Sequence, residues 1–286
     1  MSLFSDYKTS LKSFDVEEII DLLFFRPLSF LFVKLIYPTN ITPNQISVVS
    51  MIFGLLSGVM FAFGNHVFFM LGGAMVLISN VLDCADGQLA RLKKNGTKIG
   101  RVIDGFIDYV TGLSIFAGIG IGLSIYTGNY FYVWVLTLAA AGSRILQNMY
   151  FDNYRNMYMS YVYDKGANIS KEIEEFRRLR ESLKHVNGRR GEKFLVDIYI
   201  KYTSTQKTAT QDNILRISPE EYRKRNKFLL RVWSWLGSTT HLAAVIICVA
   251  FNRLDIYLWL TVTVGNVMLL ILYLIQRNVI NSLTRQ

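Results

Sequence analysis

Long apolar stretches alternate with short polar segments along most of this chain. A transmembrane helix needs about 20 predominantly apolar residues to cross the bilayer hydrocarbon, and six stretches approach or exceed that length. The expected spans cover residues 46–63, 67–82, 100–126, 130–149, 232–251 and 256–275. The pattern therefore predicts an all-α integral membrane protein with six transmembrane helices.

The segment before the first expected span is apolar but interrupted by charges. Asp15 and Glu18 have the spacing of a capping box, which predicts that a helix begins there. Pro27 is expected to kink or restart this helix, because proline has no amide N–H to donate. Since Arg26 and Pro27 interrupt the apolar run, residues 1–37 are predicted to hold an N-terminal amphipathic helix in the cytoplasmic membrane interface rather than a span.

The remaining residues, 38–286, are predicted to form one membrane domain with a cytoplasmic helical insertion. Thr42 and Pro43 are an N-cap and a first-turn proline, and they start the first span. Residues 150–217 are polar, rich in Lys and Arg, and contain short helical patterns. Ser218, followed by a proline and two glutamates, starts the helix that should continue into the fifth span. The insertion therefore lies between the fourth and fifth spans.

The composition agrees with a membrane protein and indicates its orientation. Of the 286 residues, 51% are hydrophobic and 18% are charged, and the net charge is +10. Positive charge suits an anionic membrane face, whereas no nucleic-acid-binding signature is present. The basic residues concentrate in segments 92–99 and 150–217 and in the C-terminal tail, so the positive-inside rule places these segments and both termini in the cytoplasm. We expect membrane lipid as a partner, and no nucleic acid.

Four aspartates lie where the second expected span ends and the third begins: Asp83, Asp86, Asp104 and Asp108. Ionisable side chains at membrane depth are costly and usually functional. Residues three or four apart share a helix face, and a short loop makes the two helices antiparallel neighbours, so all four carboxylates can converge. They would repel one another unless cations bind between them. Two divalent ions, Mg²⁺ or Mn²⁺, would remove the repulsion and clamp a substrate phosphate.

A purely structural role is the alternative for these residues. The aspartates could be interfacial caps and ion-pair partners of Arg91, Lys93 and Arg101. Gly87 and Ala90 either leave room for a ligand or allow close helix packing. Arg91 is placed to meet a phosphate or to balance the acids.

The spacing of these residues resembles the signature of the CDP-alcohol phosphotransferase family of membrane enzymes. The pattern is D-x2-D-G-x2-A-R-x8-G-x3-D-x3-D, and every fixed position from Asp83 to Asp108 is occupied, including Gly100. The Thr42-Pro43-Asn44 start of the first span is also similar to the family. The insertion at residues 150–217 departs from compact members.

The resemblance implies a reaction and roles for individual residues. The implied reaction transfers a phosphoalcohol group from a CDP-alcohol to an acceptor hydroxyl and releases CMP. The implied metal site comprises Asp83, Asp86, Asp104 and Asp108, of which the first three are chiefly ligands. Asp108, close by them, is also the implied general base for the acceptor hydroxyl. The implied nucleotide site comprises Asn44, Asp83, Gly87, Ala90 and Arg91.

The substrates follow less directly from the sequence. CDP-diacylglycerol with a small polar alcohol or alcohol phosphate is the expected pair, which would place the enzyme in phospholipid biosynthesis. The alternative is a soluble CDP-alcohol donor with a lipid or polyol-phosphate acceptor, and a cation transporter is a more remote one. Arg144, Arg231 and His241 are candidate acceptor-binding residues. The arginines could instead extend to lipid headgroups, and His241 could bond a neighbouring helix. Small-residue faces are compatible with a homodimer.

Overall fold

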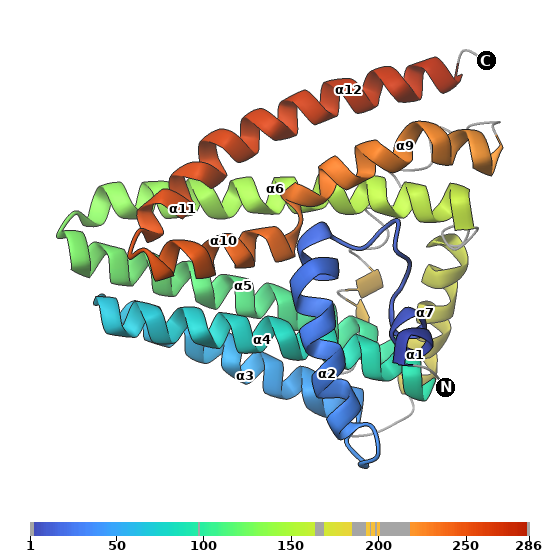
Figure 1. The fold of residues 1–286 in the computed structure, drawn as a ribbon, viewed down its shortest axis with the longest axis horizontal. Coiled ribbons are helices and arrows are strands. Elements are labelled where there is room, and N and C mark those ends of the chain that lie inside the picture. The colour runs from blue at the N-terminus through green and yellow to red at the C-terminus, as the bar shows by residue number, and fades with distance from the viewer. Residues whose placement is uncertain are drawn as a thin grey trace.

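The computed structural model describes residues 3–96, 98–163, 169–184, 193–194, 196–197, 199–200 and 218–284. Every regular element in these ranges is a helix, which confirms the all-α class (Figure 1). The main helices of the bundle are α3 (Pro43–Ala62), α4 (His66–Lys93), α5 (Lys98–Thr127), α6 (Tyr130–Tyr163), α10 (Ser238–Ala250) and α12 (Asn266–Thr284). The other elements are α1 (Leu3–Ser10), η1 (Asp21–Phe25), α2 (Arg26–Ile36), α7 (Ile169–Lys184), α9 (Pro219–Trp233), η2 (Ser234–Leu236), α11 (Leu254–Leu260) and η3 (Thr261–Gly265).

The most extensive packing in the bundle is that of α3 along α4 and α5. Glycines let the α3 and α5 backbones approach closely. A Cβ added at Gly118 would lie 2.0 Å from the carbonyl oxygen of Gly58, and one at Gly122 would lie 1.9 Å from that of Phe61. Both distances are far below van der Waals contact, so these positions accept only glycine. The small-residue faces therefore serve helix packing within the chain.

Gly118→Ala is expected to lower the free energy of unfolding by about 1–3 kcal/mol, the usual cost of overpacking a tight core. Gly142→Ala on α6 is the matched control, because nothing among the described residues lies within 4 Å of a Cβ there. In that open position, an alanine inside a helix should raise the stability by about 0.5–1 kcal/mol. Thermal unfolding of both variants in detergent micelles measures the difference, and equal stabilities would contradict the close approach.

By length and composition, four helical segments among the described residues can cross a membrane, and one bent pair raises the number to five. The segments are Pro43–Ala62, His66–Lys93, Ile103–Thr127 and Leu254–Leu283, and the bent pair is Pro219–Leu236 with Ser238–Ala250. Six spans are therefore not confirmed. The predicted fourth span, at the start of α6, is absent from this set because its tyrosines and Arg144 lower its mean hydropathy.

The helices differ in two places from the predicted span boundaries, while the domain boundaries stay a prediction. The α6 helix does not end near residue 149 but continues to Tyr163, so the first part of the expected insertion extends this helix. The insertion also contains α7, while most of residues 185–217 lies outside the described residues. The expected fifth span breaks at Gly237, where η2 ends and α10 begins, and its two parts are bent by 42°.

The N-terminal region also differs from the expectation. Its second helix begins at Ile19 rather than at Asp15, and the π-helical turn η1 precedes Pro27 and α2. Asp15 does not cap this helix, because its carboxylate pairs with Arg223 at 2.8 Å and with Lys227 at 3.0 Å on α9. Long-range ion pairs thus replace the local capping box. In Figure 1, α2 crosses the long helices, and its place in a membrane interface stays a prediction.

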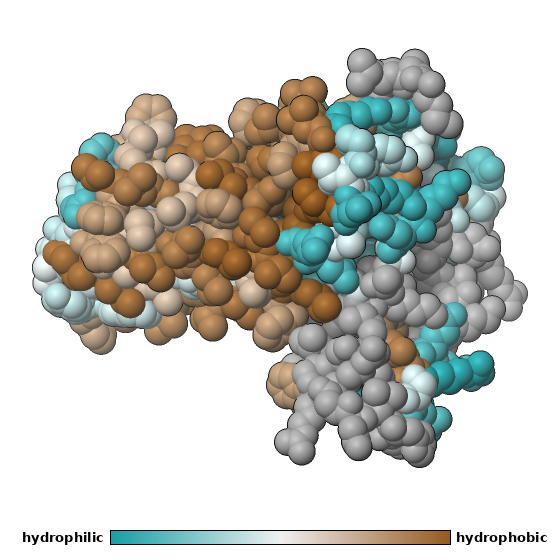
Figure 2. Space-filling model, turned by 90° about the horizontal axis from the view of Figure 1, so that it is seen from below, coloured by the Kyte–Doolittle hydropathy of each residue, from teal (hydrophilic) through white to brown (hydrophobic). Residues whose placement is uncertain are grey.

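The surface of the bundle separates by polarity. Figure 2 shows hydrophobic residues over most of the visible side of the bundle and hydrophilic residues toward its two ends. Helices that cross a membrane present this distribution, because lipid contacts their sides while water and headgroups contact their ends. Together with the four or five span-length helices, it indicates a membrane protein.

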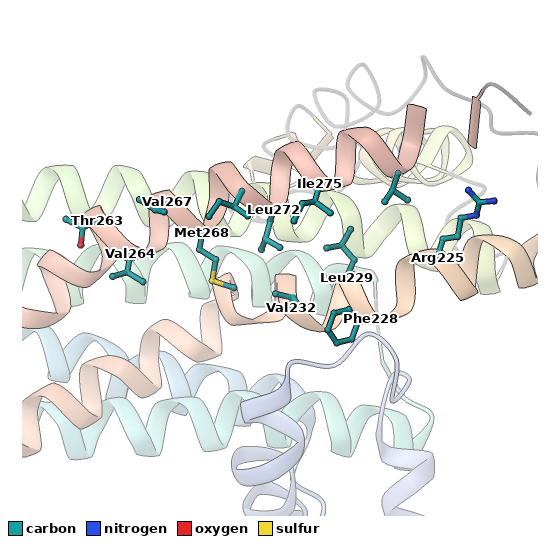
Figure 3. A pocket seen from close by; sticks show the side chains of 12 residues that line it. Arg225, Phe228, Leu229, Val232, Thr263, Val264, Val267, Met268, Leu272 and Ile275 are labelled. Atoms are coloured by element: carbon teal, nitrogen blue, oxygen red, sulfur yellow. The ribbon is translucent and has the colours of Figure 1, made fainter. Parts of the chain in front are cut away.

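An apolar groove of about 730 Å³ lies between α9 and α12 (Figure 3). It is lined by aliphatic and aromatic side chains, among them Phe228, Val232, Val267 and Met268, with Arg225 at one end. None of its lining residues belongs to α4 or α5, which carry the aspartate motif. The groove is therefore separate from the acidic site.

Candidate active site

The aspartate motif folds into one cluster of carboxylates where α4 and α5 meet. One oxygen from each of Asp83, Asp86 and Asp104 lies within 4.8 Å of the others. The α4 helix ends at Lys93, the next residue, Lys94, has a left-handed backbone with a φ of 53°, and α5 begins at Lys98. The connection is thus shorter than the predicted loop at residues 92–99. It places the start of α5 beside the end of α4 and brings the two halves of the motif together.

A hydroxyl on α3 supports the buried member of this cluster. The Ser47 hydroxyl donates a hydrogen bond to Asp86 Oδ2, and both side chains are buried. Ser47 lies in the second turn of α3, whose start is fixed as predicted by Thr42. The Thr42 side chain accepts from the Gln45 amide, and Gln45 Oε1 accepts from the Thr42 amide at 2.9 Å. Asn44, the implied nucleotide contact, is exposed in the first turn of the same helix.

Gly87, Ala90 and Arg91 form the part of α4 just beyond the clustered carboxylates. The Arg91 guanidinium covers Gly87, since Nη2 lies 3.3 Å from the position of an added Cβ. Arg91 Nε donates to the carbonyl of Ser10, while Nη2 is buried without a hydrogen-bond partner among the described residues. Ala90 is half-buried and lies against Gly96. The open N–H group of Arg91 is available to a phosphate beside Gly87.

A buried ion network supports the motif from the N-terminal side. Arg26 Nη2 lies 3.0 Å from Glu17 and 3.9 Å from Asp21, and Nη1 donates to the carbonyl of Cys84 at 3.4 Å. Gln88 donates to the carbonyl of Arg26 at 3.1 Å. Burial would raise the pKa of Glu17, but the Arg26 charge lowers it below its ordinary value. These contacts fix the rotation of α4, on which the convergence of the aspartates depends.

A carboxylate from the N-terminal region fills the break in the fifth span. Glu18 Oε2 accepts from the amides of Thr239 at 3.2 Å and Thr240 at 3.3 Å, which start α10. A Cβ at Gly237 would lie 2.3 Å from this carboxylate, so a larger residue does not fit. Burial and the nearby charge of Asp21 raise the pKa of Glu18 to about 8. The contact ties the region before α3 to the helix that carries His241.

Gly237→Ala is expected to cost about 1–3 kcal/mol of unfolding free energy in the native background, because its methyl group meets the Glu18 carboxylate. The same change should cost much less in a chain that also carries Glu18→Ala, where the space is open. Thermal unfolding of the two single variants and the double variant gives the coupling energy. Additive costs would show that the carboxylate does not occupy the break.

Asp108 lies outside the group of three carboxylates that share a space of 4.8 Å, but its charge acts on Asp83 and Asp86. It lies one turn after Asp104 on α5, and its side chain is exposed. Gly105 and Gly112 share its helix face, three residues before and four after. Among the described residues, nothing lies within 4 Å of a Cβ at Gly105, and at Gly112 only Arg144 Nη1 does, at 4.0 Å. Open space therefore flanks Asp108 on both sides along α5.

The three candidate acceptor residues have different surroundings. The guanidinium of Arg144 lies 5.7 Å from the centre of the Phe116 ring, and its Nη1 is buried without a partner among the described residues. His241 is buried, and its Nε2 also has no partner there. Arg231 donates to the carbonyl of Glu17 at 3.1 Å and to a second N-terminal carbonyl. Arg231 thus holds the N-terminal region, whereas Arg144 and His241 retain free hydrogen-bonding atoms.

Sequence reasoning missed several residues of the site. Arg26 could have been identified from the sequence, because a charge inside an apolar run close to acids indicates a buried ion pair. Ser47 lies on the inward face of a span, where a hydroxyl also serves helix packing. No sequence pattern predicts the contact between Glu18 and Gly237, since they lie far apart in the chain.

The donor set of the cluster fits a divalent cation. Three carboxylates share a space of 4.8 Å. Among the side chains that the structure describes, which do not include those of Lys98 and Arg101, no lysine or arginine forms an ion pair with them within 4 Å. Their mutual repulsion needs an opposite charge, and carboxylate oxygens are the ligands that Mg²⁺ and Mn²⁺ prefer. Asp108 lies outside this group of three.

The comparison with protein families identifies the domain. Residues 40–165 match the CDP-alcohol phosphatidyltransferase family, and this region contains the whole aspartate motif. Residues 40–165 thus resemble a CDP-alcohol phosphatidyltransferase domain, as the motif predicted. Members of this family are transferases of substituted phosphate groups.

Curated relatives resemble parts of the chain. An archaetidylinositol phosphate synthase of Pyrococcus horikoshii is 33% identical over 31% of this chain and 46% of its own length. A bifunctional IPC transferase and DIPP synthase of Thermococcus kodakarensis is 36% identical over 26% of this chain and 16% of its own length. One of the same name from Aquifex aeolicus is 26% identical over 43% of this chain and 27% of its own length. The matches thus cover less than half of each of these relatives.

Proposed function

We propose that the protein transfers a phosphoalcohol group from a CDP-alcohol to the hydroxyl of a small polar alcohol and releases CMP. CDP-diacylglycerol is the favoured donor, which places the reaction in phospholipid biosynthesis. The observation that carries the proposal is the cluster of Asp83, Asp86 and Asp104, with Asp108 one turn further along α5. The relative named as an archaetidylinositol phosphate synthase supports a lipid product.

The clustered aspartates would hold two divalent ions, Mg²⁺ or Mn²⁺. When bound, such ions polarise phosphoryl oxygens and offset the negative charge that develops on the leaving phosphate. Ser47 holds the carboxylate of Asp86, and supporting contacts of this kind orient metal ligands. Gly87 leaves space beside the cluster for the donor, and the open N–H of Arg91 would meet a donor phosphate. Ala90 and Asn44 complete the proposed nucleotide site.

Asp108 is the proposed general base. Its carboxylate would take the proton of the acceptor hydroxyl, and that oxygen would attack the phosphorus that bears the donor alcohol. The bond from this phosphorus to the bridging oxygen breaks, and CMP leaves with the electron pair. The exposed position of Asp108, between the open spaces at Gly105 and Gly112, supports this role because an acceptor can reach it there.

The proposed placement puts this chemistry at the cytoplasmic membrane surface. Residues 1–37 would lie in the interface, and residues 38–286 would form the membrane domain with the insertion at 150–217. Both termini and the aspartates would then face the cytoplasm. A lipid donor could keep its acyl chains in the bilayer while its nucleotide reaches water.

Purified protein incubated with Mg²⁺ or Mn²⁺, CDP-diacylglycerol and a panel of small alcohols tests the proposal. CMP release that requires all three components is the expected result. CMP release only with a water-soluble CDP-alcohol and a lipid or polyol-phosphate acceptor would show that CDP-diacylglycerol is not the donor. No CMP with any donor, together with an ion flux that Asp108→Asn changes, would favour a cation transporter instead.

A further inference from the structure

A small polar cavity lies where the segment after α1 meets the end of α6 and the start of α9. Its volume is about 340 Å³, and its polar lining residues are Lys8, Lys12, Ser13, Asp15, Tyr163 and Arg223. None of its lining residues belongs to α4 or α5, which carry the aspartate motif. In Figure 1, the segment after α1 runs toward α6 and α9. We call this cavity the N-terminal pocket.

A buried carboxylate holds the wall of the N-terminal pocket in place. Asp15 is 5% exposed, and it accepts hydrogen bonds from the hydroxyls of Tyr158 at 3.3 Å and Tyr163 at 3.0 Å. The same carboxylate pairs with Arg223 at 2.8 Å and with Lys227 at 3.0 Å. Burial would raise the pKa of Asp15, but its bonds to Lys227 and Tyr163 lower it below its ordinary value, so the carboxylate stays charged. Two cations on one carboxylate leave an excess of positive charge at this wall.

The two lysines of the N-terminal pocket add to this excess. Among the side chains that the structure describes, no carboxylate lies within 4 Å of the ammonium group of Lys8 or Lys12. Of the four charges that act most strongly on Lys12, three are positive. Positive charges held close together repel one another unless an anion lies among them. The pocket therefore offers a favourable place for a negatively charged group.

The hydrogen-bond donors of the N-terminal pocket match a phosphate group. The planar fork of an arginine fits phosphate oxygens, and lysine ammonium groups also bind them. Arg223 donates to Asp15 through Nη2, which orients the guanidinium, while its other N–H groups make no hydrogen bond to a described residue. A phosphate monoester carries about two negative charges at neutral pH. It thus offsets more of the positive excess than the single charge of a phosphodiester does.

A phosphate in the N-terminal pocket would reinforce a segment on which other parts of the structure depend. It would join the residues after α1 to α9, in addition to the contacts of Asp15. The same segment continues to Glu17, which pairs with Arg26, and to Glu18, which caps α10. A ligand that binds only the folded protein stabilises it. Occupation of the pocket should therefore raise the unfolding temperature.

We propose that the N-terminal pocket binds a phosphate monoester through Lys8, Lys12 and Arg223, at a site separate from the aspartate cluster. Such a group occurs on lipid headgroups and on free inorganic phosphate, and the chemistry of the pocket suits both. The inference goes beyond the proposed function and does not depend on it, because binding is measured without a CDP-alcohol.

Equilibrium dialysis of the purified full chain in detergent against radiolabelled inorganic phosphate tests the proposal. EDTA is present throughout, so that no cation holds phosphate at the aspartate cluster. Saturable binding is expected, and Lys8→Gln and Lys12→Gln should each raise the Kd about 10-fold, the effect of one lost charge-assisted hydrogen bond. Lys12→Arg should retain most of the affinity, because it keeps the charge.

Lys224→Gln is the matched control for the two lysine variants. Lys224 is exposed beside Arg223 on α9 but does not line the N-terminal pocket. The change removes one positive charge, as the other two changes do, and salt screens exposed charges that make no contact. Its Kd for phosphate should therefore equal that of the native protein. Equal Kd values in Lys8→Gln, Lys12→Gln and Lys224→Gln would overturn the proposal.

A lipid experiment distinguishes the two sources of the phosphate group. The full chain is reconstituted into phosphatidylcholine vesicles that contain either phosphatidic acid, a monoester, or phosphatidylglycerol, a diester. If a lipid headgroup occupies the pocket, phosphatidic acid should displace labelled phosphate and raise the unfolding temperature, and Lys12→Gln should weaken both effects. If phosphatidic acid displaces nothing while inorganic phosphate still binds, the ligand is a soluble phosphate. Equal displacement by phosphatidylglycerol, or no saturable phosphate binding in detergent or vesicles, would overturn the proposal.

Discussion

Asp108→Asn is expected to lower kcat by about 10²–10⁴-fold, the usual contribution of a general base. Asparagine keeps the size of the side chain and one oxygen, but it cannot take the proton of an acceptor hydroxyl. Because Asp108 lies outside the group of three carboxylates, the KM for the CDP-alcohol and the concentration of Mg²⁺ that gives half-maximal activity should stay close to native values. Steady-state CMP release at several metal concentrations separates these quantities.

Asp255→Asn is the matched control for this change. Asp255 makes a surface ion pair with Arg253 at 2.9 Å, in the turn before α11. Its loss should leave kcat unchanged, since exposed ion pairs contribute about 0–1 kcal/mol to stability. A native kcat in Asp108→Asn would remove the base assignment. A large rise in the metal requirement would instead make Asp108 a ligand, as the motif resemblance also allows.

Local sequence patterns predicted that carboxylates of α4 and α5 lie close together, and three of them do. The spacing of Asp83, Asp86 and Asp104 determines which helix faces they share, and a short connection leaves few ways to place α5 beside α4. The turns could be predicted from the sequence equally well. Gly64 and Gly128 have the left-handed conformations, with φ of 67° and 72°, that glycine favours. In these places, the residues that determine the structure are neighbours in sequence.

Features that depend on distant partners could not be predicted. Asp15 and Glu18 have the spacing of a capping box, yet Asp15 pairs with Arg223 and Glu18 caps α10 more than 200 residues away. A buried carboxylate gains more from charged or paired donors than from one local amide. The same contact explains why the apolar run around Gly237 breaks, although nothing beside that glycine in the sequence requires a break.

The extent of α6 shows a limit of hydropathy. The apolar run ends near Met149, and the sequence therefore predicted a boundary there. The helix continues because its next turns remain amphipathic: Phe151, Tyr154 and Tyr158 are buried against Trp233 and its neighbours. Polarity marks where a helix leaves the hydrocarbon, whereas packing decides where it ends.

Asp86→Asn is expected to reduce CMP release by about 10³-fold or more, since a lost metal contact removes several kcal/mol of charge stabilisation in the transition state. Higher Mg²⁺ or Mn²⁺ should restore part of the activity. Ser47→Ala is the graded comparison. It leaves the carboxylate in place but removes its hydrogen bond, and such supporting contacts are worth about 10–100-fold in metal affinity. Metal titrations of CMP release should therefore rank native protein, Ser47→Ala and Asp86→Asn in that order.

The unfolding temperature in the presence of a chelator distinguishes a metal-binding carboxylate from a structural one. Three carboxylates within 4.8 Å repel one another when no cation is bound. Removing the charge of Asp86 relieves part of that repulsion, so Asp86→Asn should unfold at a higher temperature than the native protein in EDTA. With Mg²⁺ the order should reverse, because only the native cluster gains free energy from the ion. A variant that is inactive yet more stable without metal would show that the cluster binds cations at a cost in stability. A lower unfolding temperature for Asp86→Asn in EDTA would instead assign the Ser47–Asp86 contact to helix packing.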